Sequence, residues 1–152
     1  MLKFANIIDI NRPLVEVFNF LSDFENIPKW NYYVLEVTKV SDGPIGIGTT
    51  YHQIRRTDEQ DFLITNLEPN QMVAIKTLPR SSPDFEMRFS LQREGDTTRV
   101  QDEWKLETGL PVLVEKLAAG NIKAAVAKNL TKLKELLEAG EVLLQDGRQA
   151  RL

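Results

Sequence analysis

The sequence contains no cysteine. That absence excludes disulfides, zinc–thiolate centres, thiolate nucleophiles and thiol redox chemistry. It also contains a single histidine, His52, with no acidic pair at ligand spacing around it, so we expect an exposed strand residue and no metal site. A chain without cysteine suits a reducing compartment, and we expect a cytoplasmic protein.

Long apolar runs are also missing. No run approaches the roughly 20 residues that a helix needs to span a bilayer. The N-terminal stretch MLKFANIIDIN has an acidic residue, Asp9, and lacks a small-residue cleavage site, which indicates no signal peptide. We therefore expect no integral membrane segment.

The chain has no excess of positive charge, because its net charge is −3. A nucleic-acid surface needs clustered Lys and Arg, so we expect no nucleic-acid partner. The segment GPIGIG (43–48) looks like a phosphate loop, but it has no Lys and a predicted strand follows it instead of a helix. We interpret it as a connector between strands, and nothing else indicates a cofactor.

The first 30 residues predict one strand and two short helices. Residues 2–10 combine β-branched and aromatic residues without a breaker, which favours a strand. Asn11 is a candidate N-cap for a helix that has Pro13 near its start. Ser22 and Glu25 have the spacing of a capping box, so a second helix is expected there. Apolar residues of the first helix at helical spacing are Leu14, Val17, Phe18 and Leu21.

Strands then follow for about 75 residues. The connectors are short and polar, which is typical of hairpins, so the chain predicts an antiparallel meander. The predicted strands are 32–40, 49–56, 61–68, 72–79, 84–93 and 97–107.

Alternation is clearest in the last two of these strands. Residues 84–93 place Phe85, Met87, Phe89 and Leu91 on one face. Residues 97–107 place Val100, Asp102, Trp104 and Leu106 on one face, so Asp102 is the polar member of an apolar set. A buried carboxylate needs a donor, a water or a raised pKa. A bulge or a shift of one residue would instead send Asp102 to solvent.

Residues 110–139 predict a long helix that stops at Gly140. The single domain therefore spans residues 1–140, and residues 141–152 form a mostly polar tail that we expect to fray. The continuous apolar stripe of the helix is Ile122, Val126, Leu130, Leu133 and Leu137.

This order of elements predicts an α+β protein with the helix-grip fold. The long C-terminal helix is the only element large enough to cover the apolar face of the sheet. A curved antiparallel sheet of about seven strands would wrap around it, with the two short helices after the first strand. We expect such a sheet to leave a space beneath the helix.

Five segments resemble the START-like, Bet v 1-like (SRPBCC) superfamily, specifically its polyketide cyclase/dehydrase-type bacterial members. The resemblance spans about residues 2–139 and implies a cavity. It implies binding or transport of a lipid, a quinone or an aromatic polyketide-like molecule. The matching segments are NRPLVEVFNFLSDFENIPKWN, GPIGIGTTY, ITNLEPNQMVAI, FSLQREGDTTRV and NLTKLKELLE.

In this family a Trp equivalent to Trp30 packs near the cavity, although Trp30 would also serve to plug the end of the sheet. The other large side chains would line the cavity or fill the core. We expect access through the loops RRTDEQ (55–60) and PRSSPD (79–84). The candidate ligand-binding residues are Trp30, Tyr51, Gln53, Phe62, Phe85, Met87, Phe89, Asp102, Trp104, Ile122 and Val126.

Two other functions remain open. A cyclase or dehydratase acting on a polyketide-like substrate needs a positioned acid or base in the cavity, and Asp102 with Tyr51 is the one available pair. A protein-interaction module is the third possibility, because relatives include chaperone cofactors; no segment of the sequence marks a partner surface.

Overall fold

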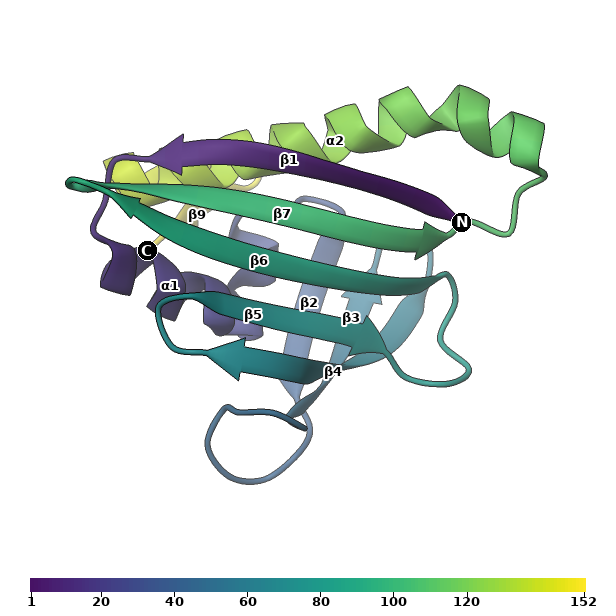
Figure 1. The fold of residues 1–152 in the computed structure, drawn as a ribbon, viewed down its shortest axis with the longest axis horizontal. Coiled ribbons are helices and arrows are strands. Elements are labelled where there is room, and N and C mark those ends of the chain that lie inside the picture. The colour runs from purple at the N-terminus through teal and green to yellow at the C-terminus, as the bar shows by residue number, and fades with distance from the viewer.

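The computed structural model describes all 152 residues and has the predicted α+β helix-grip architecture (Figure 1). A seven-stranded sheet and the long helix α2 form the two layers, and a short hairpin follows the helix. The elements are β1 (Leu2–Ile10), α1 (Leu14–Ser22), the 3-10 helix η1 (Phe24–Lys29), β2 (Val34–Lys39), β3 (Thr50–Arg55), β4 (Glu59–Glu68), β5 (Met72–Thr77), β6 (Asp84–Glu94), β7 (Thr97–Glu107), α2 (Val112–Ala139), β8 (Glu141–Leu143) and β9 (Gln149–Arg151).

The sheet has the order β1-β7-β6-β5-β4-β3-β2, and all its neighbours are antiparallel. The meander from β2 to β7 confirms the hairpin prediction, and β1 closes the edge beside β7. Register shifts between Val34 and Glu36 and between Ile64 and Asn66 bend β2 and β4. The sheet therefore curves, and α2 runs beside β1 on its concave side (Figure 1).

The two predicted caps of the short helices are wrong. α1 begins at Leu14 with Pro13 in the cap position and no side-chain cap. Asn11 instead donates its backbone N–H to Glu138 Oε2 at 2.9 Å, which ties the start of α1 to α2. At the second helix, Asp23 accepts a hydrogen bond from the Glu25 backbone at 3.3 Å, whereas Ser22 is the last residue of α1.

The helix α2 is packed unevenly along its length. Its C-terminal half buries Leu130, Leu133, Leu136 and Leu137 almost completely. Ile122 and Val126, which we expected to continue the same stripe, are only partly buried. The helix is therefore fixed to the sheet at its C-terminal half, and its middle, from Ile122 to Asn129, roofs a space.

The C-terminal segment is folded, so the prediction that residues 141–152 fray is wrong. Gly140 ends α2 in the left-handed conformation, with φ of 85°, as its position at the helix end predicts. The chain then forms the β8–β9 hairpin. Val142 and Leu144 are 4% and 3% exposed and belong to the main core, which explains why the segment is ordered.

The glycine-rich segment 43–48 leads into β3 and not into a helix. This agrees with its interpretation as a connector between strands. No helix of the structure is both long enough and apolar enough to cross a bilayer.

The hairpin contributes to stability through Leu144 but not through its neighbour Leu143, which is 62% exposed. We predict that Leu144→Ala lowers the free energy of unfolding by about 2–4 kcal/mol, because it leaves a cavity in the core. Leu143→Ala is the matched control, with a change below about 0.5 kcal/mol. Urea denaturation measures both, and equal small effects would mean that the tail does not pack as described.

Candidate ligand-binding site

A cavity of about 400 Å³ lies beneath the middle of α2, where Ile122, Ala125, Val126 and Asn129 line it. Its walls come from the concave face of the sheet, from the segment that joins η1 to β2, and from α2. The lining is mainly apolar, with 15 hydrophobic residues among 22. The lining residues are Phe4, Ile27, Trp30, Asn31, Tyr32, Tyr33, Val34, Gln53, Arg55, Gln60, Ile75, Pro83, Phe85, Met87, Phe89, Asp102, Trp104, Leu106, Ile122, Ala125, Val126 and Asn129.

Most of the candidate ligand-binding residues lie in this wall. The alternating positions of β6 and β7 face α2, as the period of two predicts. The candidates that line the cavity are Trp30, Gln53, Phe85, Met87, Phe89, Asp102, Trp104, Ile122 and Val126.

Tyr51 and Phe62 are not lining residues. They stack on each other with centroids 5.2 Å apart, and Phe24 of η1 packs edge-on against both at 5.6 and 5.7 Å. All three side chains are fully buried. For Tyr51 and Phe62 the filled-core alternative therefore describes the structure, since η1 covers this end of the sheet.

Trp30 combines the two roles that the sequence left open. It ends η1, where its N–H bonds the Ile27 carbonyl. Its ring is 7% exposed and packs edge-on against Phe89 with centroids 6.3 Å apart. Trp30 is thus both part of the core and part of the cavity wall.

Asp102 faces inward, so of the two alternatives that the sequence left open the unshifted register describes the structure. Its neighbours across the sheet are Phe89 in β6 and Asn6 in β1, with no bulge on either side of β7. The residue is 1% exposed. Its Oδ2 accepts a hydrogen bond from Trp104 Nε1 at 3.0 Å, whereas its Oδ1 has no partner.

Burial is the main cause that raises the pKa of Asp102, to about 7 from an ordinary value of 3.8. The Trp104 N–H acts in the opposite direction, and the charge of Glu103 raises the pKa further. Near neutral pH the carboxyl group is therefore divided between its acid and its carboxylate. It can donate a hydrogen bond in one form and accept in the other.

Tyr51 carries another buried oxygen without a partner, but away from the cavity lining. Burial is the main cause that raises its pKa to about 12, and the charges of Asp23 and Glu25 add to it. The hydroxyl therefore stays protonated at neutral pH. Asp102 and Tyr51 are not brought together in the wall of the cavity.

A polar strip crosses the wall from β3 toward the β5–β6 loop. Gln53 Nε2 donates to Gln60 Oε1 at 2.8 Å, and Gln60 Nε2 donates to the Pro83 carbonyl at 2.8 Å. Both glutamines are buried. Arg55, Gln60 and Pro83 bring parts of the two predicted access loops, 55–60 and 79–84, to the cavity.

Two tyrosines that the sequence analysis missed form the rim next to β2. Tyr32 and Tyr33 line the cavity, with their rings at 79° to each other. Arg55 lies over the ring of Tyr33 at 5.4 Å and Arg56 over the ring of Tyr32 at 5.5 Å. These contacts hold the rim against β3.

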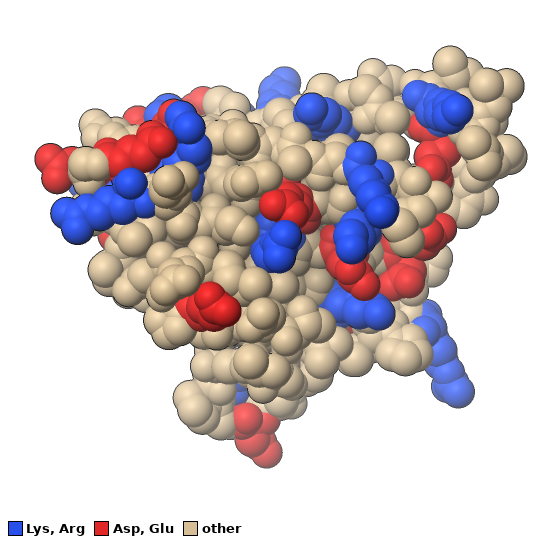
Figure 2. Space-filling model, in the orientation of Figure 1, with Lys and Arg blue, Asp and Glu red and all other residues tan.

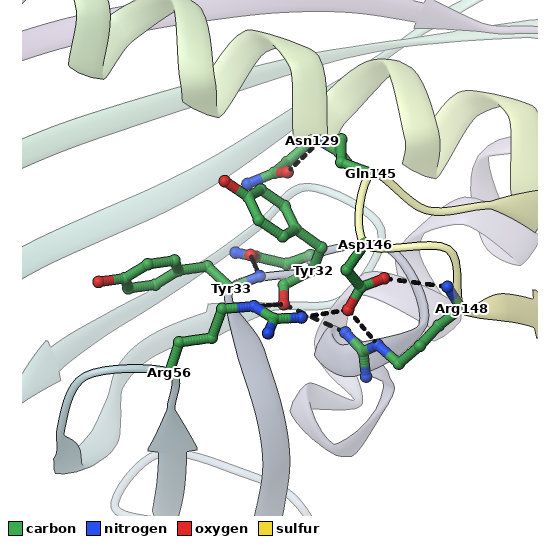
Figure 3. Close-up of polar contacts among 8 residues, drawn as sticks. Tyr32, Tyr33, Arg56, Asn129, Gln145, Asp146 and Arg148 are labelled. Atoms are coloured by element: carbon green, nitrogen blue, oxygen red, sulfur yellow. Dashed lines mark hydrogen bonds and ion pairs between the residues drawn. The ribbon is translucent and has the colours of Figure 1, made fainter.

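The C-terminal hairpin ties this rim to α2 (Figure 3). Asp146 accepts from Arg148 Nε at 2.7 Å and pairs with Arg56. Both arginines also donate to the Tyr32 carbonyl, at 3.0 Å for Arg56 and 3.2 Å for Arg148. Gln145 Nε2 then donates to Asn129 Oδ1 on α2 at 3.1 Å. We call this network of Arg56, Gln145, Asp146 and Arg148 the hairpin brace. The sequence analysis missed it because it expected residues 141–152 to fray.

His52 lies on the other face of β3, as its alternation with Tyr51 predicts. Its Nδ1 is 2.7 Å from Asp61 Oδ1, and its Nε2 is 3.2 Å from Glu59. The hydrogen bond with Asp61 is the main cause that raises the pKa of the imidazole. His52 therefore belongs to a surface ion-pair cluster and not to the cavity.

A second hollow, of about 620 Å³, lies on the outer face of the sheet. Lysines and glutamates alternate across it, so Lys76 and Lys105 flank Glu86 at 3.6 and 3.9 Å. Figure 2 shows blue and red side chains interspersed on this face. Because this hollow is lined by half-exposed ion pairs, the less open and mainly apolar cavity beneath α2 is the better candidate for a ligand site.

The family model described as "Polyketide cyclase / dehydrase and lipid transport" matches residues 1–138. No curated protein matches the sequence. The fold is similar to that of a protein from Thermus thermophilus, with a TM-score of 0.73, 19% identity and coverage of 90% of this chain and 97% of that one.

Two more solved structures share the fold. A START superfamily protein from Mycobacterium smegmatis has a TM-score of 0.68 at 18% identity, with 90% of this chain and 99% of that one covered. The di-domain ARO/CYC StfQ of the steffimycin biosynthetic pathway has a TM-score of 0.67 at 11% identity, with 89% of this chain and 44% of that one covered. At these identities the likeness is one of fold.

The raised pKa of Asp102 makes stability depend on pH. Between about pH 4 and pH 7 the folded chain keeps a proton that the unfolded chain has released, so stability falls as pH rises. Asp102→Asn keeps an oxygen for Trp104 and removes this titration. We predict that the variant gains on the order of a few kcal/mol relative to the natural protein between about pH 4 and pH 8. Urea denaturation at several pH values measures the difference, and a difference that is constant with pH would refute the assignment.

Proposed function

The chain belongs to the polyketide cyclase/dehydrase and lipid transport family, and from that premise we propose that it binds and carries a small hydrophobic molecule in the cavity beneath α2. The cavity volume of about 400 Å³ lies within the range of small-molecule sites. Its apolar lining supplies the main driving force, because burial of apolar ligand surface is favourable.

The observation that carries the proposal is the unpartnered Oδ1 of Asp102 in a mainly apolar wall. A buried polar atom without a partner costs free energy, and a ligand oxygen placed against it removes that cost. Asp102 donates to a carbonyl oxygen when it is protonated and accepts from a hydroxyl when it is ionised. We therefore infer a ligand with a largely hydrophobic body and a hydroxyl or carbonyl group.

Aromatic side chains in the wall favour a flat ring system over a flexible acyl chain. Phe85 and Trp104 pack at 5.3 Å on the sheet side, and Trp30 lies against Phe89. Rings in a ligand gain offset or edge-on contacts with such walls beyond simple area burial. A quinone or an aromatic polyketide-like molecule fits this arrangement better than a linear lipid. Mass spectrometry of an organic extract from the purified protein identifies the bound class.

Catalysis is the second candidate function, and Asp102 is the observation that favours it. A carboxyl group with a pKa of about 7 suits general acid–base chemistry at neutral pH. Because Tyr51 is not a lining residue, Asp102 would act without it, as the one carboxyl group in the lining of a cyclase or dehydratase. Binding requires only the cavity and the anchor, so we rank it first.

The anchoring role is tested with 2-naphthol and naphthalene, which differ by one hydroxyl. We predict that Asp102→Leu weakens the binding of 2-naphthol about tenfold relative to naphthalene, the equivalent of one buried hydrogen bond. Tyr51→Phe is the control, because it removes a buried unpartnered oxygen outside the cavity wall and should leave the ratio unchanged. Fluorescence titration gives each dissociation constant. An unchanged ratio in Asp102→Leu would rule out the anchor.

The position of the site is tested by filling the cavity. Ala125 lines it, whereas its neighbour Ala124 does not. We predict that Ala125→Phe weakens 2-naphthol binding at least about tenfold, since the ring occupies the space of the ligand. Ala124→Phe, with the same added volume, should bind as the natural protein does. Equal binding by both variants would place the ligand elsewhere.

A further inference from the structure

The N-terminal half of α2 is apolar on the side that faces away from the sheet. Leu113 and Leu117 are 71% and 77% exposed. With Ala124 they follow an i, i+4, i+11 pattern, so they share one side of the helix. Ile122 and Val126, which line the cavity, lie on the opposite side. This half of the helix is therefore apolar on both sides, which a surface helix of a globular protein normally avoids.

The exposed apolar character is confined to this end of the helix. In the C-terminal half the same outward side carries Lys128, Thr131 and Glu135, all exposed. Around the N-terminal half, the apolar surface is enlarged by three more side chains that are 44%, 70% and 45% exposed, those of Leu110, Val112 and Val114. This end of α2 extends past the strands in Figure 1, so its outward side is open.

The charges along residues 108–134 are almost all positive, and Glu107 just before them lies 3.9 Å from the terminal amine. From Thr108 to Lys134 the single acidic residue is Glu115. Both oxygens of its buried carboxylate already have partners. Oε2 accepts a hydrogen bond from the Thr108 hydroxyl at 2.6 Å, and Oε1 pairs with the terminal amine at 3.2 Å. Lys116 and Lys123 are exposed within the apolar half of the helix. This local positive charge stands against a net charge of −3 for the whole chain.

Apolar side chains flanked by lysines match a membrane surface that contains anionic lipids. Leucines insert at the boundary between headgroups and acyl chains, and each nearby lysine gains from the negative surface potential. A second copy of the chain fits less well. Two identical faces in a symmetric dimer would bring their lysines together without acidic partners.

We propose that residues 110–124 dock on an anionic lipid surface, with Leu113 and Leu117 inserted and Lys116 and Lys123 at the headgroups. The same turns of α2 carry Ile122 and Ala125 in the cavity roof. Docking thus places the roof of the cavity against the bilayer. A hydrophobic ligand then passes between bilayer and cavity without crossing much water. The docking itself does not depend on the proposed function.

The test is co-sedimentation of the full chain with vesicles of phosphatidylcholine alone and of phosphatidylcholine mixed with phosphatidylglycerol. We expect binding to the mixed vesicles that weakens as salt is added. The double variant Leu113→Gln with Leu117→Gln should reduce binding at least about tenfold. Lys116→Gln with Lys123→Gln should reduce it by about tenfold and only on the mixed vesicles.

The controls are Ile47→Gln and Leu143→Gln, which remove apolar residues of similar exposure, 67% and 62%, elsewhere on the surface. Equal losses in the controls, or no binding of the natural chain to either vesicle, would overturn the proposal. A dimer in solution that the leucine variants dissociate would also overturn it, because the face would then be an interface between copies. Ala125→Phe should bind vesicles normally while losing 2-naphthol, so failure of the docking is distinguishable from failure of the cavity proposal.

Discussion

The rest of the structure depends on the uneven packing of α2 against the sheet along the length of the helix. Four leucines, Leu130, Leu133, Leu136 and Leu137, fix the C-terminal half of the helix in the core. The middle of the helix presents Ile122, Ala125 and Val126 to the curved sheet below, and these side chains leave part of the space unfilled. Close packing is the rule in protein interiors, so a void of this size needs rigid walls to persist. Here the walls are the bulged strands, the aromatic cluster under η1 and the hairpin brace.

Much of this fold is readable from the sequence because its signals are local. The alternation in β6 and β7, the short polar connectors and the helical stripe of α2 each depend on a few adjacent residues. The errors occur where the outcome depends on contacts with the rest of the chain. Asn11 does not cap α1, because α1 begins at Leu14 with Pro13 in the cap position, and the Asn11 backbone N–H is bound by Glu138 of α2. The tail folds because Val142 and Leu144 find space in a core built by the rest of the chain.

The residues of the candidate site could likewise be predicted in part from the sequence. Period-two reasoning left Asp102 either inward or, after a bulge or a shift of one residue, at the surface, and the structure places it inward. This reasoning cannot separate Phe62 from Phe85, which share the concave face, because only the position of η1 decides which of them is covered. The sequence analysis did not predict the rim of Tyr32 and Tyr33, because the residues that hold it in place come from separate elements. Arg56 and Asp146 are 90 residues apart in the sequence, and no local periodicity predicts a contact over that separation.

The half-ionised state of Asp102 makes any guest in the cavity a participant in acid–base equilibrium. Binding of a ligand that has only a hydrogen-bond acceptor favours protonated Asp102, so a proton is taken up from the buffer. Binding of a ligand that has only a donor favours the carboxylate, so a proton is released. The heat of association would then vary with the ionisation enthalpy of the buffer. The stoichiometry of that exchange reports which kind of oxygen the natural guest presents, even before its chemical identity is known.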